Sequence, residues 1–211
     1  MKPIQLAGPC LAASLLMAPA TAQAFDWSLE ATITNDLIDG GERLSPGRPA
    51  GVLVAEAEAG GFFAGIELQT IRIDDDRIEI VPFLGYRHDL DPVEVEIGIA
   101  VPWADDSGRG DVEIFAGIEW AVDDRFTLGV EAAYAPSPRD WADVALTGSF
   151  AINDRLDLSA TVGRVPADRL NYAKVGLTYA LTDALAADFR AHNAREIGTR
   201  VALSLTATFG N

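Results

Sequence analysis

The feature that most constrains the fold is an alternation of apolar and polar residues with a period of two, which recurs with little interruption from Phe25 to Phe209. Between Val93 and Val101 every odd position is a β-branched aliphatic residue, while the even positions are acidic or small. Successive side chains of a strand point to opposite faces, so such a segment forms a strand with one apolar face and one polar face. The alternation predicts twelve strands, at about 25–36, 50–58, 62–72, 78–87, 93–103, 111–121, 126–135, 142–152, 156–164, 170–180, 185–192 and 199–209.

Two kinds of connection alternate along the chain. Tight polar turns are expected at 60–61, 88–92, 123–125, 153–155 and 182–184, and the other connections fall around 37–49, 73–77, 104–110, 136–141, 165–169 and 193–198. This regular alternation indicates an antiparallel meander. If the amino terminus starts on the periplasmic side of a membrane, the tight turns are periplasmic and the second set, which contains the longest loop, is extracellular.

The composition requires an environment other than water for the apolar faces. Asp and Glu total 32 against 16 Lys and Arg, yet 49% of the residues are apolar and the mean hydropathy is +0.13. No run of 18 or more apolar residues follows position 24, which argues against a transmembrane helix, and a closed barrel is the other structure that can span a bilayer. Strands near ten residues suit that role. The sequence therefore predicts an all-β, antiparallel transmembrane up-and-down β-barrel of about 12 strands.

The alternative architecture is a secreted β-sandwich, which also alternates. Its strands are shorter, at about 5–6 residues, and its polar face looks out to water. Aromatic placement favours the barrel, because Trp and Tyr gather where hydrocarbon meets the headgroups. Trp27, Trp103, Trp120 and Trp141 all fall at predicted strand ends and are the predicted interface girdle.

The amino terminus has the pattern of a cleaved signal peptide. Lys2 is followed by an apolar stretch over 4–17 and by the small-x-small sequence Ala22-Gln23-Ala24. We expect residues 1–24 to be the signal peptide and 25–211 the barrel, exported to a bacterial outer membrane. The single cysteine, Cys10, lies in the leader, so disulfides, zinc–thiolate sites and cysteine nucleophiles are not expected in the mature chain.

Several segments resemble the TorF-like porin family, whose members are small exported proteins. The corresponding stretches here are 31–41 (Ala-Thr-Ile-Thr-Asn-Asp-Leu-Ile-Asp-Gly-Gly), Pro49-Ala50, 61–65 (Gly-Phe-Phe-Ala-Gly) and 78–86, which ends in Gly85-Tyr86. The order and spacing are similar over about the first third of the chain. Leu37, Asp39 and Gly40 occupy positions where the family motif has aromatic residues and an arginine. The resemblance implies a porin-like outer-membrane barrel.

Enzymatic and metal chemistry have weak support in the sequence. Of two histidines, His88 falls in a predicted turn and His192 near the extracellular rim, where it could pair with Asp188 as a general base. A polar histidine inside the barrel is the favoured interpretation, and we expect no catalytic residue. The aspartates at 74–76 and 105–106 could hold a divalent cation, but solvated loop charge is the favoured interpretation. No metal and no cofactor is predicted.

The polar face of the strands gives the functional prediction. It should line a hydrated, acidic lumen. The acidic candidates are Glu67, Glu79, Glu94, Glu96, Asp111, Glu113, Glu119 and Glu131, and the basic candidates are Lys174, Arg190 and Arg200. The basic group is expected to face Glu79, Asp111 and Glu113 across the outer mouth, which would set up a transverse field. Gly65, Gly98, Gly117 and Gly129 are expected to keep the acidic wall thin.

The predicted function is a porin-like channel for passive diffusion of small polar or charged solutes, with a preference for cations. The alternative is a non-conducting structural or adhesion barrel whose lumen charges pair and fill it. The loop 37–49, which carries Arg43 and Arg48, is long enough to fold inward as a constriction. Expected partners are outer-membrane lipid and lipopolysaccharide, small solutes and a second copy in a homo-oligomer. Nucleic acid is not expected, because the chain lacks basic clusters.

Overall fold

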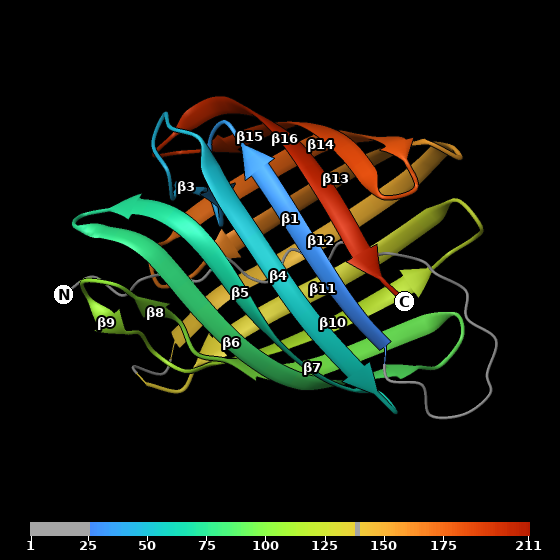
Figure 1. Cartoon of the computed structure of the whole chain (residues 1–211), viewed down its shortest axis with the longest axis horizontal. Coiled ribbons are helices and arrows are strands. Elements are labelled where there is room, and N and C mark those ends of the chain that lie inside the picture. Colours follow the sequence, from blue (N-terminus) through green and yellow to red (C-terminus); the bar gives the residue numbers. More distant parts are fainter. Residues whose placement is uncertain (1–25, 138–139) are drawn as a thin grey trace.

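The computed structural model describes residues 26–137 and 140–211, and its long strands close into an antiparallel barrel (Figure 1). The proposed signal peptide and the side chain of Trp141 lie outside the described part. The ring consists of β1 (Asp26–Thr34), β4 (Ala50–Ala59), β5 (Phe62–Ile73), β6 (Asp76–Asp89), β7 (Val93–Ala100), β10 (Glu113–Ala121), β11 (Phe126–Ala135), β12 (Asp140–Asn153), β13 (Leu156–Val165), β14 (Leu170–Thr182), β15 (Leu185–Ala194) and β16 (Gly198–Gly210).

The ring closes because β1 pairs with both β4 and β16, and β5 pairs with β6. The sheet has 14 strands, of which β8 (Trp103–Ala104) and β9 (Gly108–Arg109) extend from β6 outside the ring and the other twelve form the barrel. A separate hairpin, β2 (Ile38–Asp39) with β3 (Glu42–Arg43), lies within the first long loop. The predicted twelve-stranded up-and-down barrel is confirmed.

Exposure of the two strand faces is the reverse of that in a water-soluble protein. In β7, Ile97 is 56% exposed whereas its neighbour Glu96 is only 8% exposed. Large apolar side chains are likewise exposed around the ring, among them Leu84, Ile118, Val162, Phe189 and Leu203. Such an apolar outer belt is suited to hydrocarbon, and the polar inner face to a lumen. The β-sandwich alternative is wrong. No helix long and apolar enough to cross a membrane occurs among the described residues.

Side chains at the tight turns fix where each hairpin reverses. Asp89, Asp123 and Asn153 each accept a hydrogen bond from the backbone N–H two residues later, and the Thr182 hydroxyl does the same. These local bonds replace ladder bonds at the reversal, which is why Asx and Thr residues stand there. His88, however, lies in β6 and not in a turn, because β6 continues to Asp89.

One part of the inner face is apolar, whereas the sequence predicts a hydrated, acidic lumen. Phe63, Phe83 and Phe115 form a buried cluster with Val81, Ala100 and Ala133. The rings lie over glycines: a Cβ added to Gly65 would meet Phe83, and one added to Gly98 would meet Phe115. These two glycines therefore accommodate aromatic rings and do not thin the wall, and Gly129 is covered by the Thr147 hydroxyl.

Candidate functional site

The first long loop folds into the barrel and crosses its mouth, at the end opposite the start of β1 and the end of β16 (Figure 1). On one side Leu44 is buried in a cluster with Ile71 of β5 and Ala104 of β8. The tip reaches the wall of β13 to β15, where a Cβ added at Gly41 would lie 2.8 Å from the Tyr172 Cβ and 2.9 Å from the Ala194 Cβ. The hairpin β2–β3 therefore spans the lumen between two walls.

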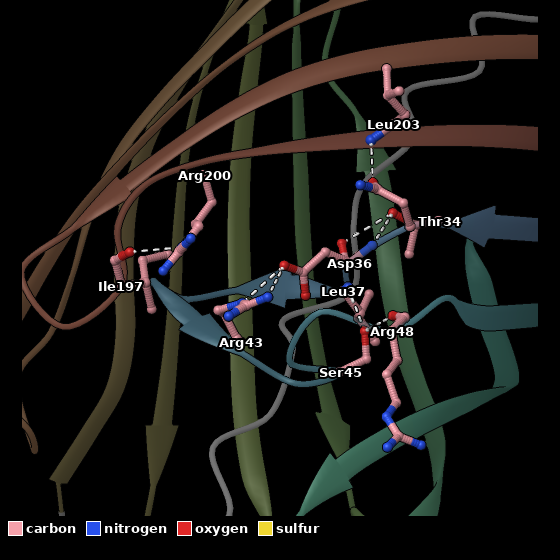
Figure 2. Close-up of polar contacts among 10 residues, drawn as sticks. Thr34, Asp36, Leu37, Arg43, Ser45, Arg48, Ile197, Arg200 and Leu203 are labelled. Atoms are coloured by element: carbon pink, nitrogen blue, oxygen red, sulfur yellow. Dashed lines mark hydrogen bonds and ion pairs between the residues drawn. The ribbon is translucent and has the colours of Figure 1, made fainter.

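Internal polar contacts hold the hairpin in shape (Figure 2). The Asp36 Oδ2 atom accepts bonds from Nε and Nη2 of Arg43 at 2.9 and 2.6 Å. The Ser45 hydroxyl accepts a bond from the Leu37 N–H at 2.7 Å and donates to the Arg48 carbonyl at 2.9 Å. Because these bonds connect the two arms of the loop, the loop has a defined structure inside the lumen.

Asp39, in β2, brings a carboxylate into the central lumen. It lies within electrostatic range of Glu67 and Glu79 on β5 and β6, of Glu131 on β11 and of Tyr172 on β14. Those strands are separated around the ring, and the hairpin that carries Asp39 crosses the lumen between two of its walls. We call Asp39, Glu67, Glu79 and Glu131 the central carboxylate ring.

Glu79 is the most buried member of this ring, with 1% of its surface exposed. Its Oε2 atom accepts a 2.6 Å bond from the Gln69 side chain, and its Oε1 atom is buried with no hydrogen-bond donor among the described residues. Glu67 is 7% exposed. A buried carboxylate oxygen without a donor is energetically costly. Glu79 Oε1 is therefore an unsatisfied hydrogen-bond acceptor.

Arg87 forms a second electrostatic centre nearer the tight turns, and it was missed in the sequence. Its guanidinium contacts Glu96 at 2.8 Å, Glu58 at 2.9 Å, Glu56 at 3.3 Å and Glu94 at 3.5 Å. It also stacks over the Phe63 ring, 4.7 Å from the centroid. One cation thus serves four carboxylates. The sequence did contain a signal for Arg87. It lies an even number of residues after Glu79 on the same strand, so both side chains face inward.

The predicted basic residues divide into two groups. Lys174 lies within electrostatic range of Glu131 and Asp143, and Arg190 pairs with Asp188 on its own strand at 2.9 Å. Arg200 is exposed at the rim and donates to the Ile197 carbonyl at 3.0 Å (Figure 2). The structure thus brings Lys174 near Glu131 and Asp143 and pairs Arg190 with Asp188. A transverse field between the basic residues and Glu79, Asp111 and Glu113 stays a prediction.

Most of the predicted acidic candidates lie on the inward face of their strands. Glu67, Glu79, Glu96 and Glu113 are buried, and Glu94, Glu119 and Glu131 are partly buried at inward positions. Asp111 differs, because β10 begins at Glu113 and Asp111 lies exposed in the preceding loop. Inward carboxylates outside that set include Glu56, Glu58 and Asp143.

His192 is buried between cationic neighbours. It pairs across strands with Lys174 and Arg200 and is 8% exposed. Close by, the Tyr172 hydroxyl donates to Asp143 Oδ2 at 2.7 Å. Asp188, the predicted partner of His192, accepts hydrogen bonds from Thr178 and Arg190. Within residues 26–137 and 140–211, His192 and Asp188 do not form the histidine–carboxylate hydrogen bond of a general base.

The acidic loop residues tie two loops together. Asp76 Oδ1 accepts from the Asp106 and Ser107 amides at 2.8 and 2.9 Å, and Asp105 Oδ1 accepts from the Arg77 and Ile78 amides at 2.7 and 3.1 Å. These bonds hold the Asp105 pKa below its ordinary value. The carboxylates are thus occupied by backbone donors. Among the described residues no three His, Cys, Asp or Glu side chains are grouped so that they could hold a metal ion.

The described tryptophans lie on the outer surface near the two ends of the barrel. Trp27, Trp103 and Trp120 are 44%, 56% and 46% exposed. Trp27 and Trp120 are at the end where β1 begins and β16 ends, and Trp103 is in β8 at the other end. Contact with lipid headgroups stays a prediction.

Comparisons with known proteins bear on the fold. The KdgM porin superposes with a TM-score of 0.65 at 13% identity, covering 86% of this chain and 99% of that one. A second KdgM structure, in complex with disordered oligogalacturonate, gives 0.64 at 11% identity over 87% and 99%. The NanC porin gives 0.55 at 14% over 88% and 99%.

The chain has the fold of a porin-type outer-membrane β-barrel. That fold is shared with an enzyme, since outer membrane phospholipase A from Escherichia coli superposes with a TM-score of 0.51 at 14% identity, over 87% of this chain and 89% of that one. No family model and no curated protein matches the sequence. The resemblance to the TorF-like family therefore stays a prediction.

Proposed function

We propose that this protein is an outer-membrane channel through which small polar and charged solutes diffuse passively, with a preference for cations. The observation that carries the proposal is the excess of acidic over basic side chains on the inner face, where Glu67, Glu79, Glu96 and Glu113 are buried and Glu94, Glu119 and Glu131 are partly buried. Carboxylates that line a narrow, low-dielectric passage attract cations and repel anions.

The hairpin supports a channel that is narrow. It covers the sector of the mouth between β5 and β14, because Leu44 and Gly41 contact those walls. The remaining passage is bordered by β7, β10, β11 and β12, whose inward side chains include Glu96, Glu113, Glu131 and Asp143. A solute would pass between this acidic wall and Asp39.

The negative charge of the side chains that line the lumen argues against an acidic oligosaccharide as the solute. The KdgM structure with oligogalacturonate concerns a polyanion. In the present chain, the corresponding lumen presents buried carboxylates such as Glu67, Glu79 and Glu113. These would repel a polyanion, so the shared fold is proposed to serve solutes of the opposite charge here.

The second candidate is a non-conducting structural or adhesion barrel. Two observations favour it: Arg87 neutralises part of the charge of Glu56, Glu58, Glu94 and Glu96, and the cluster around Phe63 fills part of the lumen with apolar side chains. We also propose export by a signal peptide, outer-membrane lipid and lipopolysaccharide as partners, association as homo-oligomers, and no catalytic activity.

The deciding experiment is single-channel recording of refolded protein in a planar bilayer under a salt gradient. Stable conductance steps with a reversal potential of the cation-selective sign are expected. Glu113→Lys should reduce cation selectivity, whereas Lys174→Glu should increase it. Protein that is inserted but silent would contradict the channel and favour the structural barrel. Selectivity for anions would contradict the role assigned to the carboxylates.

A further inference from the structure

We propose that a groove on the outer face of the barrel binds one acyl chain of a membrane lipid, whose headgroup lies at the loop end of the barrel. The groove has a volume of about 620 Å³ and is lined by residues of β1, β13, β14, β15 and β16 and of the first long loop. These five strands are consecutive around the ring (Figure 1). The inference rests on the proposed placement in an outer membrane and is independent of whether the lumen conducts.

Two parallel rows of outward side chains line the groove. Cross-strand pairing forms the first row from Leu156, Tyr179, Ala187, Leu205 and Ile33. Pairing in the same way forms the second row from Leu177, Phe189 and Leu203. Because Ile33 is 67% exposed and Phe189 is 50% exposed, both rows belong to the apolar outer belt, which faces hydrocarbon in a membrane.

A small side chain makes the wall hollow at this place. Ala187 stands between Tyr179 of β14 and Leu205 of β16 in the first row, and its methyl group leaves a depression between two large neighbours. Asp188 also borders the groove, but its carboxylate accepts hydrogen bonds from side chains of β14 and β15. The surface that a ligand meets is thus mainly apolar, and the ligand it suits is a hydrocarbon chain.

The length of the groove corresponds to one acyl chain. The first row crosses five strands, from Leu156 at the start of β13 to Ile33 near the end of β1. Four spacings between strands give a length of about 19 Å. One leaflet of the hydrocarbon core is roughly 15 Å thick, so a single tilted acyl chain can lie along the whole row.

Polar groups lie beside the loop end of the groove. β1 ends at Thr34, whereas β16 continues past it, and from Ala202 to Gly198 it pairs only with β15 among the described strands. Asn35 borders the groove at this point, is exposed, and hydrogen-bonds to both backbone groups of Leu203. An apolar groove with a polar end matches a lipid whose headgroup lies at the loop end.

The groove is smaller than a stable contact between two copies of the barrel. It is lined by 13 residues, whereas a stable interface takes about 20–30 residues from each partner. The outside of a barrel is also convex, so a second barrel would rest on the two rows and leave the space between them empty. An acyl chain is narrow enough to enter that space, and lipid covers the rest of the belt in a membrane.

The test places the refolded full chain in phosphatidylcholine vesicles that contain a phospholipid with a photoreactive diazirine on one acyl chain. After illumination, the labelled residues are identified by peptide mass spectrometry. Ile118 and Val130 are outward residues of β10 and β11 and serve as the reference for the belt. Labelling of Phe189 and Leu203 is expected to exceed that reference by about fivefold, which is equivalent to ~1 kcal/mol.

The position of the diazirine along the chain tests the orientation of the lipid. A diazirine near the headgroup should label Ile33 at the loop end of the groove, and one at the end of the acyl chain should label Tyr179. The reverse order would overturn the assignment of the headgroup to the loop end.

A filled groove should lose its lipid. Ala187→Phe is expected to reduce labelling of Phe189 and Leu203 to the level of the rest of the belt. The matched control is Ala116→Phe, the same enlargement of an outward alanine on β10, which should leave labelling of the groove unchanged. Both positions face lipid, where a larger apolar side chain is tolerated. Leu205→Phe narrows the groove from β16 and replaces the first variant if that variant does not fold.

The outcomes separate the lipid site from the proposed channel. Inserted protein that is labelled evenly around the belt, or groove labelling that survives Ala187→Phe, would overturn the lipid site and leave the channel standing. Groove residues that are labelled less than the belt, together with a cross-linked dimer, would overturn it in favour of a second copy. Protein that does not enter the vesicles would overturn the outer-membrane placement and the lipid site together. Preferential labelling in a barrel without conductance would support the lipid site and contradict the channel.

Discussion

The guanidinium of Arg43 binds a single oxygen of Asp36 through both Nε and Nη2, and the Asp36 side chain is only 8% exposed. This pair joins the start of the loop to β3, and the other oxygen of Asp36 has no donor among the described residues. The shape of the hairpin therefore depends on a cation that the hairpin itself supplies.

Arg43→Ala should loosen the hairpin, because it leaves a buried carboxylate without its counter-charge, a loss of about 1–3 kcal/mol for a partly exposed pair. We expect larger and noisier single-channel currents. Arg48→Ala is the control, since it removes the same charge from an exposed side chain of the same loop. Identical currents from both variants would show that the pair does not hold the hairpin in place.

Removal of the Arg87 charge should destabilise the barrel, since four glutamates lose their shared counter-ion. Arg87→Met is expected to lower the free energy of unfolding by about 1–3 kcal/mol, measured by urea titration, with the full buried-pair value reduced because the side chain is 21% exposed. Adding Glu96→Gln should restore part of the loss. Arg155→Met, in an exposed turn, is the matched control and should change stability little.

Gly41 is the position at which the hairpin tip touches the far wall, with φ of +81°. Gly41→Ala should lift the tip, because the new Cβ would overlap Tyr172 and Ala194, at a cost of about 1–3 kcal/mol. Trypsin cleavage after Arg43 should then become about tenfold faster. Gly60→Ala has a similar φ of +60° but open space around it, so unchanged cleavage in that variant separates contact with the wall from backbone strain.

The tether between the β5–β6 tip and the β8–β9 loop should weaken only in acid. The Arg77 and Ile78 amides hold the folded pKa of Asp105 below its ordinary value of 3.8. A depressed pKa means that the contribution is complete above about pH 4 and is lost as the pH falls through the folded value. Hydrogen exchange at Arg77 and Ile78 should therefore show constant protection from pH 8 to about 5. In Asp105→Ala these amides should exchange faster at every pH, and equal protection in both proteins would contradict the tether.

The twelve long strands could be predicted because a lipid-facing barrel obeys one repeating rule, apolar outward and polar inward. Phe126–Ala135 and Phe62–Ile73 agree with the predicted segments to within one residue. The rule fails for the apolar residues that face the lumen. Phe63, Phe83 and Phe115 are aromatic yet inward, because each ring finds a glycine or another ring beside it, a contact between strands that alternation along one strand does not reveal.

The candidate site was less predictable than the fold. The alternation along each strand predicts that Glu79 and Glu113 face inward. It does not predict which carboxylates lie close together, because that depends on the stagger between strands and on the path of the first loop. Asp39 illustrates the point: its sequence neighbours suggest an ordinary turn, and only the packing of Leu44 and Gly41 against two walls shows that its hairpin crosses the lumen.

The pairing of β1 with β16 makes the barrel a ring in which the first and last strands are ordinary neighbours. The Trp27 amide donates to the Asn211 side chain at 3.0 Å, and the Asn35 side chain accepts from the Leu203 amide at 2.7 Å at the other end of the same seam. Strand order along the gene and strand order around the barrel are thus separable. A circularly permuted chain could be joined between Asn211 and Asp26 and opened at the Gly60-Gly61 turn. It would keep the same hydrogen-bonded ladders, but β4 and β5 would then be the terminal strands whose pairing closes the barrel.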